Sequence, residues 1–204
     1  MRGSPLSGGV LQRRMGLGLA ALGRPGYINL DRKSELGSAT ERPVQAMRER
    51  TEAVLDAAWK EGVRWFDCAR SYGLSEEFVG GWLRSRGVAP ADVVVSSKWG
   101  YRYVADWQVE VEGTGPHEVK EHTADHFEHQ LQETLEHVGE YVRLYQIHSA
   151  TFESGVLEND DVLALTYKLP GKSTSSRNPN PDHARMHARL TPLPHNGADV
   201  PCSG

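Results

Sequence analysis

Short apolar segments alternate with amphipathic helix patterns along most of the chain, and this alternation constrains the fold more than any other feature. Residues 92–98 (DVVVSSK) have the continuous β-branched character of a strand buried on both faces. The other strand candidates are 15–22, 63–67 and 142–147. None of them is joined to the next by a hairpin, so they require right-handed crossovers in a parallel sheet. The sequence therefore predicts an α/β fold with about four βα units.

Three helix patterns occupy the gaps between these strands. Pro43 opens the first and Gly62 closes it, while Ser75, Glu76 and Glu77 begin the second. The third pattern covers residues 123–138, and its predicted apolar stripe is Phe127, Leu131, Leu135 and Val138. Each helix is thus expected to pack one face against the sheet.

Composition excludes several kinds of partner and compartment. The net charge of −4, without any dense Lys/Arg run, gives no attraction for nucleic acid or an anionic membrane. No apolar run approaches the ~20 residues that a membrane span needs. The two cysteines, Cys68 and Cys202, form no CxxC pair, so a reducing, cytoplasmic location is expected. The first 30 residues carry four arginines and no acid, which leaves organelle targeting as the alternative.

Three of the four predicted strands finish on an ionisable residue. These are Asp67, Lys98 and His148, and Tyr72 follows Asp67 by five residues. In a parallel α/β sheet the side chains that carry chemistry lie at the carboxyl ends of the strands, which share one edge. Charged groups at such an edge must be partnered or functional. We therefore expect these four side chains to meet at one site.

These strand ends and their flanking residues resemble the aldo-keto reductases, (β/α)8 TIM barrels that use NADPH or NADH to interconvert carbonyls and alcohols. The likeness rests on GLGLAALG, AWKEGVRWFDCARSYGLSEEFVGGWL, VVVSSKWG and VRLYQIHS, and covers roughly residues 14–165. The family's Asp, Tyr, Lys and His tetrad finds a match at each step and in order. The resemblance implies that Asp67, Tyr72, Lys98 and His148 are catalytic. It also implies NADPH as cofactor, with NADH as the alternative, and a small carbonyl or sugar substrate.

The chemistry of such a reaction agrees with this set. A hydride that reaches a carbonyl carbon leaves negative charge on the oxygen, so a proton donor must face that oxygen. A phenol with an ordinary pKa near 10 gives up its proton reluctantly, and a nearby ammonium group lowers that pKa. Lys98 would act in this way on Tyr72, Asp67 would hold Lys98, and His148 would donate a second hydrogen bond.

Each of these residues also has an ordinary structural explanation when taken alone. Asp67 could cap a helix or close an Asx turn, and Lys98 could be a solvated strand end. Tyr72 could pack in a turn, and His148 could be a satisfied core histidine. At the level of function, the alternative is a non-catalytic half-barrel that binds a protein partner, as the potassium-channel β subunits that resemble this family do.

The glycine-rich segment GLGLAALG permits two interpretations. Gly16, Gly18 and Ala21 match the GxGxxA fingerprint of doubly wound dinucleotide-binding folds. That fingerprint requires a helix to begin at once, whereas Gly23 and Pro25 follow here. The resemblance instead places Gly18, Leu19 and Ala20, together with Asp67, at the nicotinamide end of the cofactor.

Two further groups of residues suggest chemistry that we do not expect. His122, His126 and His129 have helical spacing, but all three lie roughly opposite the apolar stripe, so we predict a solvated face and no metal site. Cys68 follows Asp67 on the other side of its strand and is expected to be a buried, inert thiol.

The resemblance ends before the chain does. We expect a partial aldo-keto reductase domain over 14–167 and a disordered, low-order tail over 168–204, where six prolines and no aromatic residue occur. A complete barrel needs eight strands and about 250 residues. An incomplete barrel leaves an open edge on each side, which favours self-association or aggregation. We also expect weak NADPH binding and little turnover. In the loop 99–120, the VEVE segment is expected to form a small surface hairpin.

Overall fold

The computed structural model describes residues 15–26, 43–107, 116–168 and 187–189. Four strands lie side by side in chain order, and all of them are parallel. They are β1 (Gly16–Gly18), β2 (Trp65–Asp67), β3 (Val94–Trp99) and β6 (Val142–Ile147). Because the order is sequential and crossovers are right-handed, the connecting helices fall on one side of the sheet. This is the arrangement of consecutive barrel strands, and it confirms the predicted parallel α/β fold rather than a doubly wound sheet.

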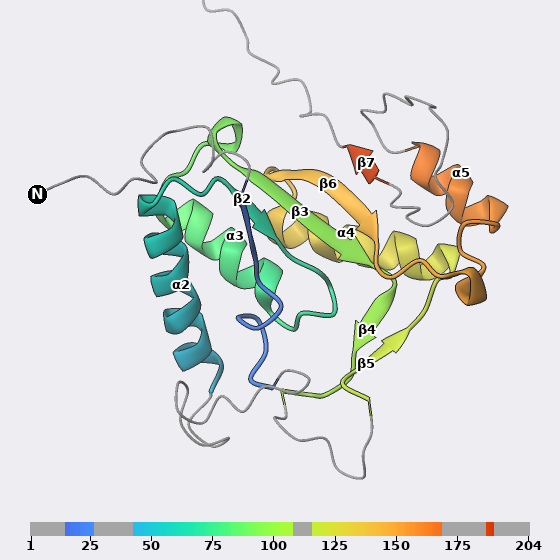
Figure 1. Ribbon diagram of the computed structural model, residues 1–204, viewed down its shortest axis with the longest axis horizontal. Coiled ribbons are helices and arrows are strands. Elements are labelled where there is room, and N and C mark those ends of the chain that lie inside the picture. Colours follow the sequence, from blue (N-terminus) through green and yellow to red (C-terminus); the bar gives the residue numbers. More distant parts are fainter. Residues whose placement is uncertain (1–14, 27–42, 108–115, 169–186, 190–204) are drawn as a thin grey trace, which may run out of the picture.

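Three helices cover that side of the sheet (Figure 1). They are α2 (Val44–Lys60), α3 (Ser75–Ser85) and α4 (Ala124–Val138). Phe66 of β2 and Val95 of β3 point toward them and are fully buried against Leu55, Trp82 and Val138. The helices contribute their apolar stripes, and burial of these side chains is the main force that holds the layers together. None of the helices in the described ranges is both long and apolar enough to span a membrane.

The predicted helix ends are mostly correct, with one difference at α3. Pro43 precedes the first residue of α2, and Gly62 follows its end with a φ of 88°. Thr123 caps α4 by accepting a hydrogen bond from the backbone N–H of His126. Ser75 does not cap α3, because its hydroxyl donates to the carbonyl of Ala69 in the preceding loop.

Helix α4 buries Phe127 and Val138 of the predicted apolar stripe, and Leu131 packs against the core, whereas the prediction is wrong for Leu135. Leu135 is largely exposed and Leu131 is only partly buried. The buried residues are His126, Phe127, Gln130, Thr134 and Val138. Two of the polar side chains that face inward are hydrogen-bonded: Gln130 accepts from Gly100 N–H and donates to Tyr101 O, and Thr134 donates to Glu76.

The opposite side of the sheet, here called the inner face, carries the polar strand ends. Trp65 and Asp67 of β2 point to this face, as do Val94, Ser96 and Lys98 of β3, because side chains alternate along a strand. Trp65 and Val94 are cross-strand neighbours and both remain partly exposed. The inner face is therefore apolar where the strands begin, at Trp65 and Val94, and polar at their carboxyl ends, here called its upper edge.

One edge of the parallel sheet is covered by a strand from the predicted tail. Residues His187–Arg189 form β7, which pairs antiparallel with β6. The prediction of open edges on both sides is therefore wrong at β6, whereas β1 is the last strand on the other side. Within the predicted low-order tail the structure thus describes these three residues as a strand, and the rest of 169–204 lies outside the described residues.

The structure contains two further elements, a hairpin and a helix, at positions where the sequence did not predict them. A hairpin joins β4 (Tyr101–Tyr103) to β5 (Glu118–Lys120), whereas the VEVE segment lies outside the described residues. Helix α5 (Asp160–Lys168) packs against α4, and its Val162 is buried beside Phe127. Short 3₁₀ turns occur at Pro90–Asp92 and Phe152–Ser154.

Candidate active site

The four predicted residues meet at the upper edge of the inner face. Lys98 Nζ lies 2.5 Å from Asp67 Oδ2 and also donates to the carbonyl of Cys68 at 2.8 Å. The same ammonium nitrogen lies 4.8 Å from the centroid of the Tyr72 ring. The Tyr72 and His148 rings are edge to face with their centroids 5.5 Å apart. The fold thus assembles one phenol, one imidazole and one ion pair within contact distance.

Strand register explains why Asp67 and Lys98 meet. Asp67 pairs with Ser96, so Lys98, two residues further along β3, emerges on the same face. The loop after β2 stays close to β3, because Arg70 N–H donates to Lys98 O at 3.0 Å. It then turns at Tyr72 and Gly73, where φ is 60° and a Cβ would meet the Gly23 carbonyl at 2.4 Å. Only glycine allows this close approach, which places Tyr72 over the strand ends.

His148 is fixed at the end of β6 and is neutral. Its backbone N–H donates to Trp99 O at 2.8 Å. Burial lowers its pKa to about 4, and the nearby charge of Lys98 acts in the same direction. Its Nδ1 lies 3.4 Å from the Ser71 hydroxyl oxygen. A neutral imidazole with one nitrogen held in this way can act as a hydrogen-bond donor through the other nitrogen.

Ser96 was not predicted as part of the site, yet it completes the network around Asp67. Its hydroxyl donates to Asp67 Oδ1 at 2.6 Å and accepts a hydrogen bond from Trp65 Nε1 at 2.8 Å. Both carboxylate oxygens of Asp67 are therefore occupied, one by Ser96 and one by Lys98. The alternation of Ser96 and Lys98 along β3 was the available sequence signal, since it places both on one face.

Arg24 also belongs to the site, although nothing in the sequence singled it out. It follows β1 in a loop rich in glycine and proline, and it is 1% exposed. Its Nη1 donates to Ser71 O at 3.1 Å and forms an ion pair with Glu118 Oε2 at 3.1 Å. Its guanidinium carbon lies 5.9 Å from the centroid of the Tyr72 ring.

Glu76 forms a buried polar centre behind the site. It lies in the first turn of α3 but points inward, where it accepts from Ser97 and Thr134 and pairs with Arg70 at 2.7 Å. These donors come from β3, α4 and the loop that carries Tyr72. Arg70 is also bound by Glu133 of α4. The sequence indicated a helix-terminal acid here, whereas the structure gives Glu76 three partners that lie 6 to 58 residues away.

The β4–β5 hairpin lies against His148. The Tyr101 and His148 ring centroids are 4.9 Å apart. His122 Nε2 donates to the carbonyl of His148 at 3.1 Å, and burial lowers the pKa of His122. Of the three histidines expected on a solvated face, His129 is exposed but His126 is buried, so that prediction is wrong in part. Within the described ranges, no three His, Cys, Asp or Glu side chains are placed to hold a metal ion.

The loop after β1 was predicted to face a nicotinamide. A Cβ built on Gly18 would meet no atom within 4 Å, so there is open space above this residue, next to Asp67. Ala20 is partly exposed. The side chain of Leu19, in contrast, is buried in the core, its N–H donates to Asp67 O, and its carbonyl accepts from Leu22 and Gly23. Gly18 and Ala20 are therefore the residues of this loop that a ring could approach.

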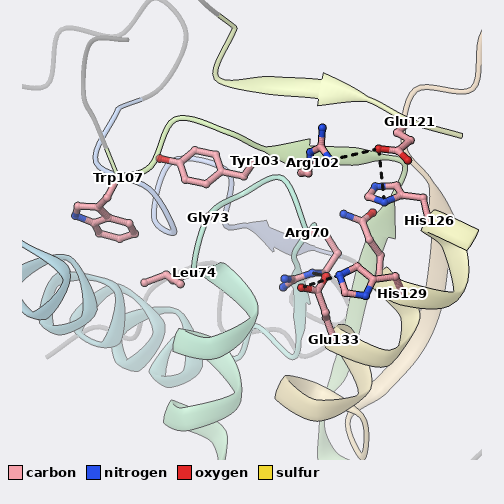
Figure 2. Close-up of a pocket in the computed structure, with 11 residues that line it drawn as sticks. Arg70, Gly73, Leu74, Arg102, Tyr103, Trp107, Glu121, His126, His129 and Glu133 are labelled. Carbon is pink, nitrogen blue, oxygen red and sulfur yellow. Dashed lines mark hydrogen bonds and ion pairs between the residues drawn. The ribbon is translucent and has the colours of Figure 1, made fainter. Parts of the chain in front are cut away.

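A cavity of about 370 Å³ lies between the β4–β5 hairpin, the loop that follows β2 and one face of α4 (Figure 2). Figure 2 shows two clusters of charged side chains in its wall. In one of them Glu133 binds Arg70, and in the other Glu121 lies near Arg102 and His126. Its lining residues include none of the four predicted catalytic residues.

Cys68, expected to be inert, is fully buried, and burial raises the pKa of its thiol.

Most of the chain is similar to known proteins. The model of the Aldo/keto reductase family matches residues 14–167, which is more than half of the chain. No curated protein matches the sequence. Two crystal structures of a candidate aldo-keto reductase from Pseudomonas aeruginosa are similar at 22% identity, with a TM-score of 0.48 in each case. The similar region covers 75% of this chain. It covers 50% and 49% of the two Pseudomonas aeruginosa chains, so this chain spans about half of their length.

Proposed function

Because the chain belongs to the aldo/keto reductase family, we propose that its site interconverts a carbonyl and an alcohol with Tyr72 as general acid and base. The observation that carries the proposal is the ion pair of Lys98 and Asp67, whose ammonium nitrogen lies 4.8 Å from the centre of the Tyr72 ring. A cation at this distance favours the phenolate over the phenol, so the Tyr72 oxygen can both release and accept a proton. Asp67, itself held by Ser96, fixes the position of that cation.

The remaining residues complete the environment of a substrate oxygen. In reduction, the oxygen gains negative charge, and Tyr72 donates the proton that neutralises it. With the Ser71 hydroxyl donating to Nδ1, His148 carries its proton on Nε2 and offers a second hydrogen bond. Because the pKa of His148 is near 4, the imidazole does this without a charge of its own at neutral pH. Positioned proton transfer of this kind contributes roughly 10²- to 10⁴-fold to the rate.

The cofactor would be NADPH, with NADH as the alternative, and when bound it supplies or accepts the hydride. The open space above Gly18, beside Ala20 and Asp67, fits a flat nicotinamide ring. Glycine at position 18 is required for this, since any larger side chain there would point into that space. The substrate is a small carbonyl compound or a sugar.

Replacing Tyr72 by phenylalanine tests the proposal. Tyr72→Phe keeps the ring and its contacts with His148 but removes the proton that is transferred, so turnover should fall by at least about 10²-fold. Tyr141→Phe is the matched control, because its hydroxyl donates to Val88 O, and its partners Val88 and Glu140 are not among the four proposed catalytic residues. The assay follows NADPH absorbance with a panel of aldehydes, ketones and sugars. Equal activity of the wild-type chain and Tyr72→Phe would contradict the proposal and favour the non-catalytic, partner-binding alternative.

Cofactor affinity is a separate prediction. Gly18 and Ala20 are the residues that we propose at the nicotinamide end, where Gly18 has open space beside it, and we expect the other contacts of a dinucleotide to be few. Binding of NADPH should therefore be weak, and turnover low. Fluorescence titration with NADPH measures this directly, and saturation at micromolar concentrations or below would contradict it.

A further inference from the structure

Arg24 is a buried cation beside the tyrosine. Its guanidinium carbon lies 5.9 Å from the Tyr72 ring centroid, and Lys98 Nζ lies 4.8 Å from the same centroid. The phenol thus has two cations within cation–π distance of its ring. Arg24 is fixed in this place, because its Nη1 donates to the carbonyl of Ser71, the residue before Tyr72.

Burial of Arg24 needs a reason, because a guanidinium group loses its hydration when it leaves water. Its ion-pair partner Glu118 belongs to β5, far along the chain, and is itself partly exposed. An apolar side chain would fill the same space without that cost. The charge of Arg24 is also felt at the site, where it contributes to the lowered pKa of His148. A fixed positive charge next to the reacting phenol is a use that accounts for this burial.

The charges that face Tyr72 come from five elements. Lys98 of β3 and Arg24 of the β1 loop are positive, Asp67 of β2 and Glu118 of β5 are negative, and His148 after β6 is neutral above about pH 4. Asp67 is paired to Lys98, and Glu118 is paired to Arg24. The contacts that reach the Tyr72 ring come from the two cations, Lys98 Nζ at 4.8 Å and the Arg24 guanidinium carbon at 5.9 Å from its centroid.

We propose that Arg24 is a positioning residue for Tyr72, whose fixed charge favours the phenolate and whose hydrogen bond to Ser71 holds the loop. The proposal rests on the function proposed for Tyr72. Phenolate is the form that removes a proton, so the charge of Arg24 should let the oxidative step, with an alcohol or a sugar hydroxyl, proceed at a lower pH. In that step the O–H proton passes to the Tyr72 oxygen and the C–H hydride passes to NAD(P)⁺. The substrate carbon becomes a carbonyl and the cofactor is reduced.

Two substitutions of opposite charge test this. Arg24→Gln removes the cation, so the Tyr72 titration should move to higher pH by about one unit. Glu118→Gln removes the anion that offsets Arg24, so the titration should move to lower pH by a similar amount. The readout is the ¹³Cζ resonance of labelled tyrosine, followed against pH in the full chain. Tyr72→Phe identifies the Tyr72 signal, and no cofactor or turnover is required.

The sign of the two shifts decides the question. A substitution that only loosens the loop would move both variants in the same direction, whereas the charge of Arg24 requires opposite directions. Shifts of equal sign, no shift in either variant, or a Tyr72 that stays protonated in all three chains up to alkaline unfolding would overturn the inference. If Arg24→Gln does not fold, Glu118→Gln still tests it through its downward shift.

Turnover separates this inference from the proposed function. Where the opposite shifts occur but no substrate is oxidised, Arg24 acts on Tyr72 and the proposed function fails. Where alcohols are oxidised, the pH at which the rate reaches half its alkaline plateau should rise in Arg24→Gln and fall in Glu118→Gln. An active chain whose pH profile is the same in both variants would refute the role of Arg24 and leave the proposed function intact.

Discussion

His148 shows at the scale of one residue how burial sets chemistry. Its ring lies edge to face with those of Tyr72 and Tyr101, and burial lowers its pKa to about 4. The unfolded chain binds a proton at this residue near pH 6.5, whereas the folded chain does so only near pH 4. Acid therefore favours the unfolded state between these values. The stabilisation from neutral His148 is complete above pH 6.5 and is lost as the pH falls to 4.

We expect the free energy of unfolding to rise between pH 4 and pH 6.5, with His148 contributing up to about 3 kcal/mol of the change. His148→Gln should reduce this dependence without abolishing it, because burial lowers the pKa of His122 and His126 as well. His129→Gln is the control, since that side chain is 71% exposed. Urea unfolding at pH 4.5 and pH 7 measures the difference. An unchanged pH dependence in His148→Gln would show that the imidazole is not kept neutral by the fold.

Residues at strand ends were predictable from the sequence, whereas their partners were not. Asp67, Lys98 and His148 each interrupt an apolar run, and the sheet brings such interruptions to one edge. Ser96 and Arg24 give no such signal, because serine is common in strands and Arg24 stands in an irregular loop. Their roles depend on strand register and on a loop approach that glycine at positions 23 and 73 permits.

At the scale of elements, the helix starts and stops were predicted better than the helix faces. Thr123 and Gly62 act locally, so their effect can be inferred from neighbouring residues. The inward face of α4 depends instead on what lies opposite. Thr134 turns inward because Glu76 of α3 accepts its hydrogen bond, and Leu135 turns outward as a result. Tertiary hydrogen bonds between elements therefore add polar side chains to the inward face of α4 and leave Leu135 outside it, while Phe127 and Val138 remain buried as predicted.

Glu76 and its neighbour Glu77 provide a direct test of that buried centre. Glu76→Gln leaves Arg70, Ser97 and Thr134 facing an uncharged side chain, so we expect a loss of about 2–4 kcal/mol in the free energy of unfolding. Glu77→Gln breaks only the surface pair with Arg48 and should cost no more than about 1 kcal/mol. Denaturant unfolding of both variants gives the comparison. Similar losses would mean that Glu76 does not hold the three elements together.

At the scale of the whole molecule, the inner face and the edge of β1 are the surfaces without a covering element among the described residues. Val94 is 39% exposed on the inner face, next to Trp65. Apolar groups and strand edges placed in this way favour association between chains. The β6 edge is different, because β7 pairs with it. The sequence could not indicate this pairing, since His187–Arg189 has no strand pattern of its own.

We expect the isolated chain to self-associate as its concentration rises, and Val94→Lys to shift it toward the monomer. Val119→Lys is the matched control, because Val119 is 37% exposed on the β4–β5 hairpin, away from the inner face. Sedimentation velocity over a range of concentrations reports the change. A wild-type chain that remains monomeric throughout, or equal effects of the two substitutions, would show that the inner face is not the associating surface.

The central claim is that Asp67, Lys98 and Tyr72 act as one proton-transfer unit at the carboxyl ends of the parallel strands. A double-substitution cycle on the single-turnover rate with NADPH and an aldehyde tests it most directly. Lys98→Met and Asp67→Asn should each lower the rate by roughly 10²-fold, and the double variant should lose little more, because either change removes the placed cation. Losses that multiply in the double variant, or a wild-type rate in either single variant, would contradict the account.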